Sequence, residues 1–241
     1  SILDDPMDLQ EFGDIKKITC KLASSKNNSK ITFDDESDSL LGKILPNKTI
    51  HKILDTNINK NKNIETLIKY KSIRKKTYAN EVSIKIDDKD EVPANIFILS
   101  TYDKYLLNQT NIKFISENLN QTALSMSVEG LFKKQNHAIQ IFTPKGPLAF
   151  LPFSENHASM VWSLKNDSGE LNHQKVDLEN IVNKYFENEI GSIKIKDIET
   201  HQLDFKFAKK LYDKKSIIIG NIAHNIHPIA GQGLNLSIKD I

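Results

Sequence analysis

Residues 217–236 read IIIGNIAHNIHPIAGQGLNL, so a short apolar run enters a loop with one proline and then a second apolar segment. The three isoleucines at 217–219 predict a buried strand, and the residues after Gly233 predict the first turns of a helix. A loop that enters a helix in this way can place bare backbone N–H groups against an anionic or electron-rich ligand. We therefore expect a ligand site where this loop meets its helix.

The composition is that of a globular protein, with 39% hydrophobic and 27% charged residues in 241. This length is sufficient to bury a core in one domain or two. No apolar run approaches the roughly 20 residues of a membrane helix, and no signal-peptide hydrophobic region opens the sequence. Cys20 is the single cysteine, which excludes an internal disulfide and a cysteine metal cluster. A reducing, cytoplasmic location is expected.

The charge pattern argues against nucleic-acid binding. The formal net charge is only +2, and Arg74 is the single arginine among 33 basic residues. Base and phosphate recognition usually draws on the bidentate guanidinium of arginine. The lysines are intermixed with 31 acidic residues, which is typical of a solvated surface.

Two kinds of segment alternate along the chain. The apolar runs at 96–99 and 217–219 predict strands of a parallel sheet that is buried on both faces. The middle of the chain predicts antiparallel strands at 128–131, 137–142, 148–153 and 158–164. A further strand is predicted at 64–69, and the apolar spacing at 177–189 predicts an amphipathic helix. Because the two kinds interleave, we expect discontinuous domains.

The pattern from Gly220 to Asn235 resembles the second flavin-binding motif of the aromatic-ring flavoprotein monooxygenases, the para-hydroxybenzoate hydroxylase superfamily. It is most similar to the ubiquinone-biosynthesis hydroxylase branch. Three other stretches support that branch: GKILPNKTIHKIL at 42–54, QIFTPKGPLAFLP at 140–152 and ASMVWS at 158–163. The resemblance runs from about residue 36 to the end of the chain.

The resemblance implies an α/β fold, with a partial FAD-binding Rossmann-like domain of the glutathione-reductase type interleaved with an antiparallel β-sheet substrate domain. The FAD-binding domain is expected at 36–108 and 204–241, and the substrate domain at 15–35 and 109–203. None of the nine glycines forms the family's G-x-G-x-x-G fingerprint, so the first βαβ unit is missing. The chain is expected to be incomplete or degenerate at the N-terminus: an internal fragment, one piece of a split protein, or a decayed or repurposed homologue.

The resemblance also implies cofactor-binding residues. Asn221 would reach the ribityl chain of FAD, Pro228 would lie near the isoalloxazine ring, and His51 would approach the phosphates. Backbone N–H groups at the helix N-terminus would face the pyrimidine side of the ring. The expected contacts there are Gly231, Gln232, Gly233, Leu234 and Asn235.

A substrate pocket is expected beside the flavin ring. Its wall would be formed by Phe142, Phe150, Leu151, Pro152 and Trp162. The alternative for each of these apolar residues is an ordinary place in the core. No side chain is assigned a catalytic role, since flavin carries the chemistry. No metal is expected either, because His224 and His227 are three residues apart with no third ligand nearby.

The implied function is hydroxylation of a polyprenylated phenol in ubiquinone biosynthesis, with FAD, O2 and NAD(P)H. Partners would be the phenol or quinone precursor and other ubiquinone-biosynthesis proteins or a missing N-terminal chain, with peripheral association at the inner membrane. The alternative is an inactive, accessory or split-subunit homologue that binds a lipid-like ligand or a partner hydroxylase. Thr101 and Tyr102 favour the alternative, because they stand where the family has Asp-Gly.

Overall fold

The computed structural model describes residues 12–23, 29–34, 40–67, 69–79, 81–87, 89–186, 189–227 and 231–241. The chain forms two compact units. Unit 1 comprises residues 1–64 and 120–202, and unit 2 comprises residues 65–119 and 203–241. Both units are discontinuous, as the sequence suggests. The units divide the chain at other residues than the expected domains, because residues up to 64 group with unit 1 and residues 109–119 with unit 2; the assignment of an FAD-binding and a substrate domain stays a prediction.

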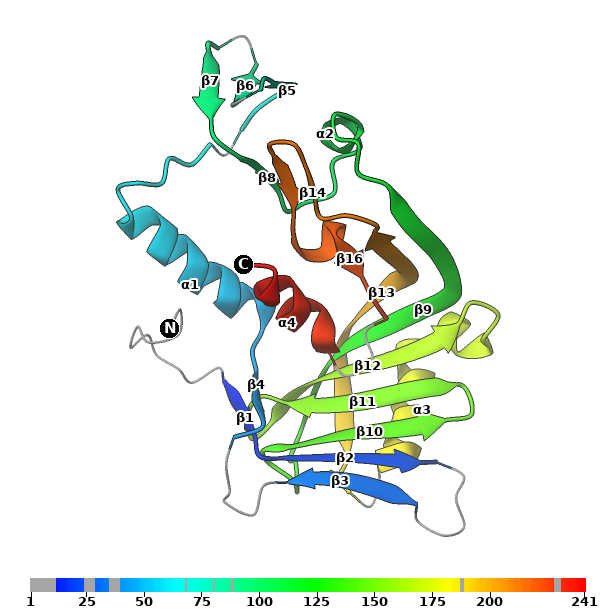
Figure 1. Ribbon diagram of the computed structural model, residues 1–241. Helices are drawn as coiled ribbons and strands as arrows, with labels where there is room; N and C mark the ends of the chain where they lie inside the picture. The colour runs from blue at the N-terminus through cyan, green and yellow to red at the C-terminus, as the bar shows by residue number, and fades with distance from the viewer. Residues whose placement is uncertain are drawn as a thin grey trace. The chain divides into compact units, whose positions relative to one another are not determined.

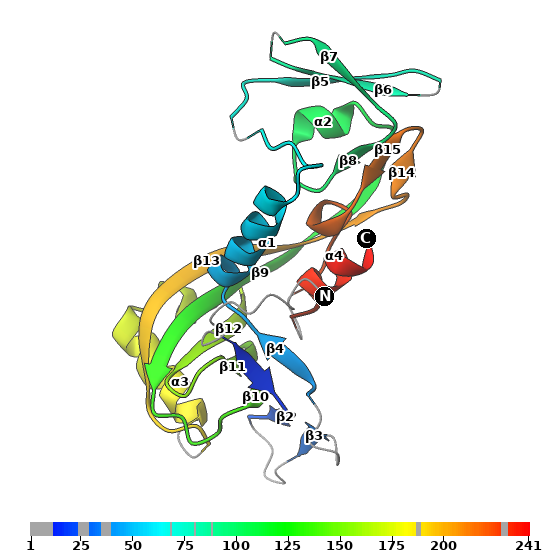
Figure 2. The ribbon, with the colours of Figure 1, turned by 90° about the vertical axis from the view of Figure 1, so that its left-hand side faces the viewer.

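Unit 1 is built on a large sheet. Its strands follow the order β16 (His224–Asn225), β13 (Ile193–Ala208), β9 (Phe114–Gly130), β12 (His157–Lys165), β11 (Gly146–Pro152), β10 (His137–Thr143), β2 (Lys17–Leu22) and β3 (Lys30–Asp34). Strand β16 and the residues 114–119 and 203–208 of β9 and β13 are counted with unit 2. Strands β9 and β13 are the longest, with 17 and 16 residues, and lie side by side (Figure 2).

The antiparallel prediction for the middle of the chain is confirmed. Strand β12 pairs antiparallel with β9 and with β11, and β11 pairs antiparallel with β10. The edge of the sheet differs from that pattern, because β2 joins β10 in parallel and β3 then folds back on β2. Hydrophobic periodicity alone does not specify the direction in which a distant strand joins a sheet.

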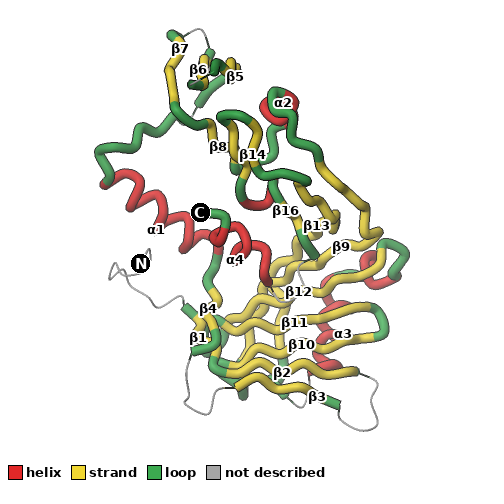
Figure 3. The backbone as a smooth tube through the Cα atoms, in the orientation of Figure 1, coloured by secondary structure: helices red, strands yellow, loops and turns green. Residues whose placement is uncertain are grey.

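Helix α3 (Lys175–Phe186) covers one face of this sheet (Figure 3). The helix was expected at 177–189, and its buried side chains Leu178, Val182 and Phe186 have the predicted helical spacing. They pack against alternate residues of the strands, among them Phe150 and Trp162, neither of which is exposed to solvent. Alternation along each strand turns the intervening side chains to the other face.

Smaller elements complete unit 1. Strand β1 (Gly13–Ile15) pairs antiparallel with β4 (Gly42–Ile44), helix α1 (Asn47–Lys60) follows, and the short helix η1 (Gly169–Asn172) precedes α3. Gly13 lies against β11, where a Cβ atom would come within 2.4 Å of the Pro152 carbonyl oxygen. Only glycine permits that approach.

Unit 2 contains two three-stranded sheets (Figure 1). One has the order β14 (Tyr212–Asp213), β15 (Ser216–Ile218) and β8 (Phe97–Leu99); the other is an antiparallel meander of β5 (Ile73–Thr77), β6 (Val82–Ile86) and β7 (Glu91–Ala94). The remaining elements are α2 (Lys104–Asn108), η2 (Gly220–Ile222), β16 (His224–Asn225) and α4 (Gln232–Lys239). The parallel pairing of β8 with β15 confirms the predicted pairing of the two apolar runs, but burial on both faces is wrong for β8, where Ile98 is 57% exposed.

The strand expected at 64–69 does not form in the described residues of that segment. Ile64 and Leu67 are 47% and 41% exposed, so this short apolar run has no face to bury. Among the described residues, no helix is long and apolar enough to span a membrane.

Candidate functional site

The candidate site begins where two parallel strands end side by side. Strand β8 pairs in register with β15, from Phe97 opposite Ser216 to Leu99 opposite Ile218. The register continues for one more step, because the amide of Ile219 donates to the carbonyl of Leu99 at 3.1 Å. The loops that follow the two strands therefore start next to each other. The carboxyl ends of parallel strands are the usual place for a ligand in α/β folds.

A cleft of about 730 Å³ opens at this point in unit 2. This volume is within the range of small-molecule and cofactor sites. Its lining comes from the loop after β8, the start of β9, the end of β13 and the loop after β15: Ser100, Thr101, Tyr102, Ser116, Glu117, Asn118, Asp204, Phe205, Lys206, Asn221, Ile222 and Asn225. The structure thus brings Asn221 together with Thr101 and Tyr102, which are 119 or more residues away in the sequence.

Gly220 makes the tight turn into the cleft. Its φ of +73° is in the left-handed region, where an L side chain is strained. A Cβ atom there would also contact Ser237 of α4 at 3.7 Å and the carbonyl oxygen of Ser100 at 3.9 Å. The loop after β15 is therefore packed between the end of β8 and helix α4, and Asn221 is left exposed at the cleft.

Asp240 fixes this loop to the end of α4. One carboxylate oxygen accepts from the Gly220 amide at 2.7 Å, and the other is 2.9 Å from Nε2 of His224. The two side chains are 10% and 6% exposed. Burial raises the pKa of the Asp240 carboxyl, but the hydrogen bonds from Gly220 and His224 outweigh it, and the net pKa is lowered. Asp240 is therefore held as a carboxylate that orients the Gly220 turn.

The other nitrogen of His224 is unusual. Nδ1 is buried and has no hydrogen-bond partner among the described residues. The sequence places no third metal ligand near His224 and His227, and in the structure His224 contacts Asp240. No group of three or more His, Cys, Asp or Glu side chains with the spacing of a metal site is found in the part of the chain that the structure describes.

Helix α4 presents an open N-terminus. Gly231 precedes its first residue with a φ of +61°, and no side chain of the described residues caps the helix there. A Cβ atom on Gly231 or Gly233 would meet no atom of the described part of the chain within 4 Å. Gln232, Leu234 and Asn235 are exposed. The first backbone N–H groups of α4 are therefore accessible to a ligand with electron-rich oxygen or nitrogen atoms, which the pyrimidine edge of a flavin has. These residues fit that group.

Tyr102 and Lys206 occupy one side of the cleft. The ammonium of Lys206 lies 3.8 Å from the centroid of the Tyr102 ring and 4.5 Å from that of Phe114. The nearby Asp103 does not line the cleft, because its carboxylate accepts from the Leu106 amide at 2.9 Å and caps α2. Asp103, which follows Thr101 and Tyr102 at the position where the family has Asp-Gly, therefore caps helix α2.

The remaining expected cofactor residues are placed as follows. Pro228 lies outside the described residues. His51 is exposed on α1 in unit 1, whereas Asn221, Gly231 and Asn235 belong to unit 2. The contact of His51 with the flavin phosphates stays a prediction.

The five expected pocket residues separate into two sets. Phe150 and Trp162 have no exposed surface and belong to the core against α3. Pro152 is also buried, and the alternation along β11 places it on the same face as Phe150. Phe142 is 39% exposed and Leu151 is partly buried, and both alternate to the face of the sheet opposite α3. Only these two have accessible surface for a ligand ring.

Sequence reasoning missed two features of the site. The pair of Asp240 with His224 joins positions 16 residues apart, and the contact of Lys206 with Tyr102 joins positions 104 apart. Neither spacing has a local signature. The sequence signal for the first pair is an Asp, Asp240, at the end of the helix that follows the loop with His224.

A cleft at the ends of parallel strands and a helix entered through glycine are each recurrent cofactor-binding features, although no residue of α4 lines this cleft. Residues 72–241 match the FAD binding domain family, and the chain belongs to that family. Ubiquinone hydroxylase UbiL of Rhodospirillum rubrum is 30% identical over 128 residues, 50% of this chain and 29% of that protein. The 3-demethoxyubiquinol 3-hydroxylase of Escherichia coli is 32% identical over 123 residues, 50% of this chain and 32% of that protein. This chain thus aligns with less than a third of either relative.

The solved structures agree on the fold. Klebsiella pneumoniae HpxO, solved in complex with FAD and uric acid, superposes with a TM-score of 0.69 over 97% of this chain and 63% of that chain, at 12% identity. The expected α/β fold with an antiparallel sheet is confirmed at this level, and so is the resemblance to the ubiquinone-biosynthesis hydroxylases.

Proposed function

We propose that this chain is the flavin-ring part of a FAD-dependent hydroxylase that acts on the aromatic ring of a polyprenylated phenol in ubiquinone biosynthesis. The observation that carries the proposal is the cleft after β8 and β15, with Asn221 at its edge, in a chain whose α4 has an open, glycine-entered N-terminus. Membership of the FAD binding domain family and the names of the two relatives support the same chemistry.

Bound FAD would supply the redox chemistry, taking reducing equivalents from NAD(P)H and activating O2. The residues of the chain bind and orient. Backbone N–H groups of Gly231 through Leu234 donate to the electron-rich edge of the ring, where negative charge increases on reduction. The amide of Asn221 offers a donor and an acceptor to the polyol chain, and the turn at Gly220, fixed by Asp240, sets the position of Asn221.

In this proposal fewer residues contact the substrate than the sequence suggests. Phe142 and Leu151 offer apolar contact to an aromatic ring, while Phe150, Pro152 and Trp162 support them from the core. A polyprenylated substrate partitions into the bilayer, so we place the protein in the cytoplasm at the surface of the inner membrane. Other ubiquinone-biosynthesis proteins, or a chain that carries a G-x-G-x-x-G segment, are its proposed partners.

The test is a titration of the purified chain with FAD, followed by the visible absorption and fluorescence of the flavin. We expect binding, with Asn221→Ala weakening the affinity by about tenfold, the loss of roughly one hydrogen bond of about 1.4 kcal/mol. Asn108→Ala is the matched control, since Asn108 is exposed on α2 and does not line the cleft. Equal affinities for the two variants would refute the assigned role of Asn221.

A second candidate is an accessory homologue without catalysis. The observation in its favour is that Thr101 and Tyr102 replace Asp-Gly, with Lys206 seated on the Tyr102 ring. This arrangement places an aromatic side chain in the cleft. A chain that stays colourless under excess FAD, and yet binds a lipid-like phenol or a partner hydroxylase, would decide for this candidate.

A further inference from the structure

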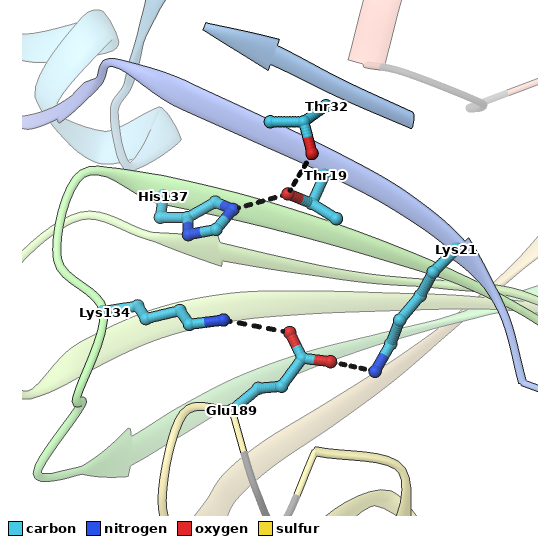
Figure 4. A network of polar contacts seen from close by, with 6 residues as sticks. All are labelled: Thr19, Lys21, Thr32, Lys134, His137 and Glu189. Atoms are coloured by element: carbon cyan, nitrogen blue, oxygen red, sulfur yellow. Dashed lines mark hydrogen bonds and ion pairs between the residues drawn. The ribbon is translucent and has the colours of Figure 1, made fainter. Parts of the chain in front are cut away.

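A second cleft, which we call the cationic cleft, lies in unit 1. Its volume is about 700 Å³. Five ammonium groups line it, from Lys17, Lys21, Lys30, Lys134 and Lys184, together with one carboxylate, Glu189. Figure 4 shows its centre, where Lys21 and Lys134 converge on Glu189 below the pair of Thr19 and His137.

The cleft arises from a change of chemistry along one face of the sheet. On β10 and β11 the side chains that face α3 are apolar, such as Ile141 and Phe150. On β2 the same alternation places Lys17, Thr19 and Lys21 on the side that lines the cleft. Strand β3 pairs in register, so that Thr32 lies opposite Thr19 and Lys30 opposite Lys21.

Among the described residues, the positive charges of the cationic cleft exceed the acidic groups that contact them. Glu189 is shared by Lys21 and by Lys134, the latter at 3.1 Å. Lys17 pairs with Asp34 at 2.7 Å. Among the described residues, no carboxylate lies within ion-pair distance of Lys30 or Lys184. Five lysines less one glutamate leave a net charge of +4 in the lining, or +3 when Asp34 is included.

Burial affects the two titrating groups differently. It raises the pKa of Glu189, but hydrogen bonds from Lys21 and Lys134 outweigh it and the net pKa is lowered, so that Glu189 stays ionised. Burial lowers the pKa of His137, and the charges of Lys134 and Lys17 lower it further. His137 is thus neutral, and its Nε2 lies 2.8 Å from the Thr19 hydroxyl. His137 and Thr19 therefore offer neutral hydrogen-bonding groups beside the lysines of the cationic cleft.

We propose that the cationic cleft binds a phosphate-bearing ligand. A single carboxylate would leave most of the excess charge uncompensated, whereas a phosphate or pyrophosphate ester carries two or more negative charges. Lysine ammonium groups are compact point charges that suit tetrahedral phosphate oxygens, while planar carboxylates favour the fork of arginine. Leu22, Ile141 and Tyr185 add apolar surface for the organic part of the ligand. This site is separate from the FAD proposal, since none of its residues lines the cleft after β8 and β15 or belongs to α4.

The test uses the double variant Lys30→Gln/Lys184→Gln, which removes two charges that have no ion-pair partner in the described part of the chain and leaves the Glu189 contacts intact. The matched control is Lys165→Gln/Lys194→Gln, two exposed lysines of unit 1 outside the cleft. Inorganic pyrophosphate is titrated into each protein by calorimetry. A second arm measures co-sedimentation with phosphatidylglycerol vesicles, against phosphatidylcholine vesicles, to distinguish a lipid headgroup from a soluble phosphate.

We expect pyrophosphate to bind the wild-type chain and the control alike, and the cleft variant about tenfold or more weakly, with an affinity that falls as salt is added. Sedimentation with phosphatidylglycerol that depends on Lys30 and Lys184, without binding of pyrophosphate, would assign the phosphate to a lipid headgroup. The proposal is overturned if neither probe binds, or if the cleft and control variants bind equally. FAD titration of the same variants should give the wild-type affinity, so a failure here is distinct from a failure of the flavin proposal.

Discussion

The replacement Asp240→Asn tests how the flavin loop is held. The carboxylate accepts from the Gly220 amide at 2.7 Å and contacts His224 at 2.9 Å, with only 10% of its side chain exposed. A hydrogen bond to a charged group stabilises by about 1.5–3 kcal/mol. Asparagine keeps one acceptor oxygen and presents an amide NH2 in place of the other. The variant should therefore lose about one such bond, roughly 2 kcal/mol of stability.

The measurement is amide hydrogen exchange of the segment 216–224. A loss of about 2 kcal/mol raises the opening equilibrium by roughly thirtyfold, which is well within the range of the method. Asp90→Asn is the control, because Asp90 is exposed in unit 2 and makes no contact of this kind. If exchange in 216–224 were unchanged, or rose equally in the control, the bond between Asp240 and Gly220 would not be what holds the loop.

The same contact predicts a pH dependence. The pKa of Asp240 is lower in the folded chain than in the unfolded one. Its contribution to stability is therefore fully present above the unfolded pKa of about 4 and is lost as the pH falls through the folded pKa. Asp240→Asn should flatten this acid limb of the unfolding free energy, and an unaltered acid limb would contradict the assignment.

Three further variants test the site and the core. Gly233→Ala should raise the stability of α4 by about 0.5–1 kcal/mol in thermal unfolding, because a Cβ atom there meets no described residue within 4 Å. The same Cβ atom would hold the flavin ring away from the backbone and weaken FAD binding, so an unchanged FAD affinity would show that α4 does not contact the flavin. Trp162→Ala should lower the free energy of unfolding by about 3–5 kcal/mol in chemical denaturation, because the indole is fully buried. Trp162→Phe should lower it clearly less, since the indole N–H has no partner among the described residues. A small loss for alanine would argue against a core position. Lys206→Met should destabilise unit 2 by about 0.5–2 kcal/mol through loss of its contacts with Tyr102 and Phe114, and a neutral result would show that the ring contacts carry no net energy.

Local pattern was sufficient for much of the fold. The runs at 96–99 and 217–219 are apolar throughout, and they form the parallel pair β8 and β15. The spacing of Leu178 and Val182 identified helix α3. The spacing of the buried residues of α3 records their burial directly, whereas the apolar run at 96–99 does not, because Ile96 and Ile98 are 51% and 57% exposed.

Long-range arrangement was less accessible. For Phe150 and Trp162 the sequence favours the core residue by residue but leaves the pocket open, and the position of α3 identifies them as core. The cationic cleft joins Lys17 of β2 to Lys184 of α3, and the parallel docking of β2 on β10 brings them together. A strand at 64–69 was predicted from its apolar residues, but Ile64 and Leu67 find no surface to cover. In each case the deciding contact is remote in sequence.

The central claim is that FAD lies against the loop after β15 and the N-terminus of α4. Hydrogen exchange of the whole chain with and without saturating FAD tests it most directly. The account predicts that FAD protects residues 100–102, 220–225 and 231–235, and that Asn221→Ala needs about tenfold more FAD for the same protection. Flavin binding that protects only other segments, or no binding at all, would contradict it.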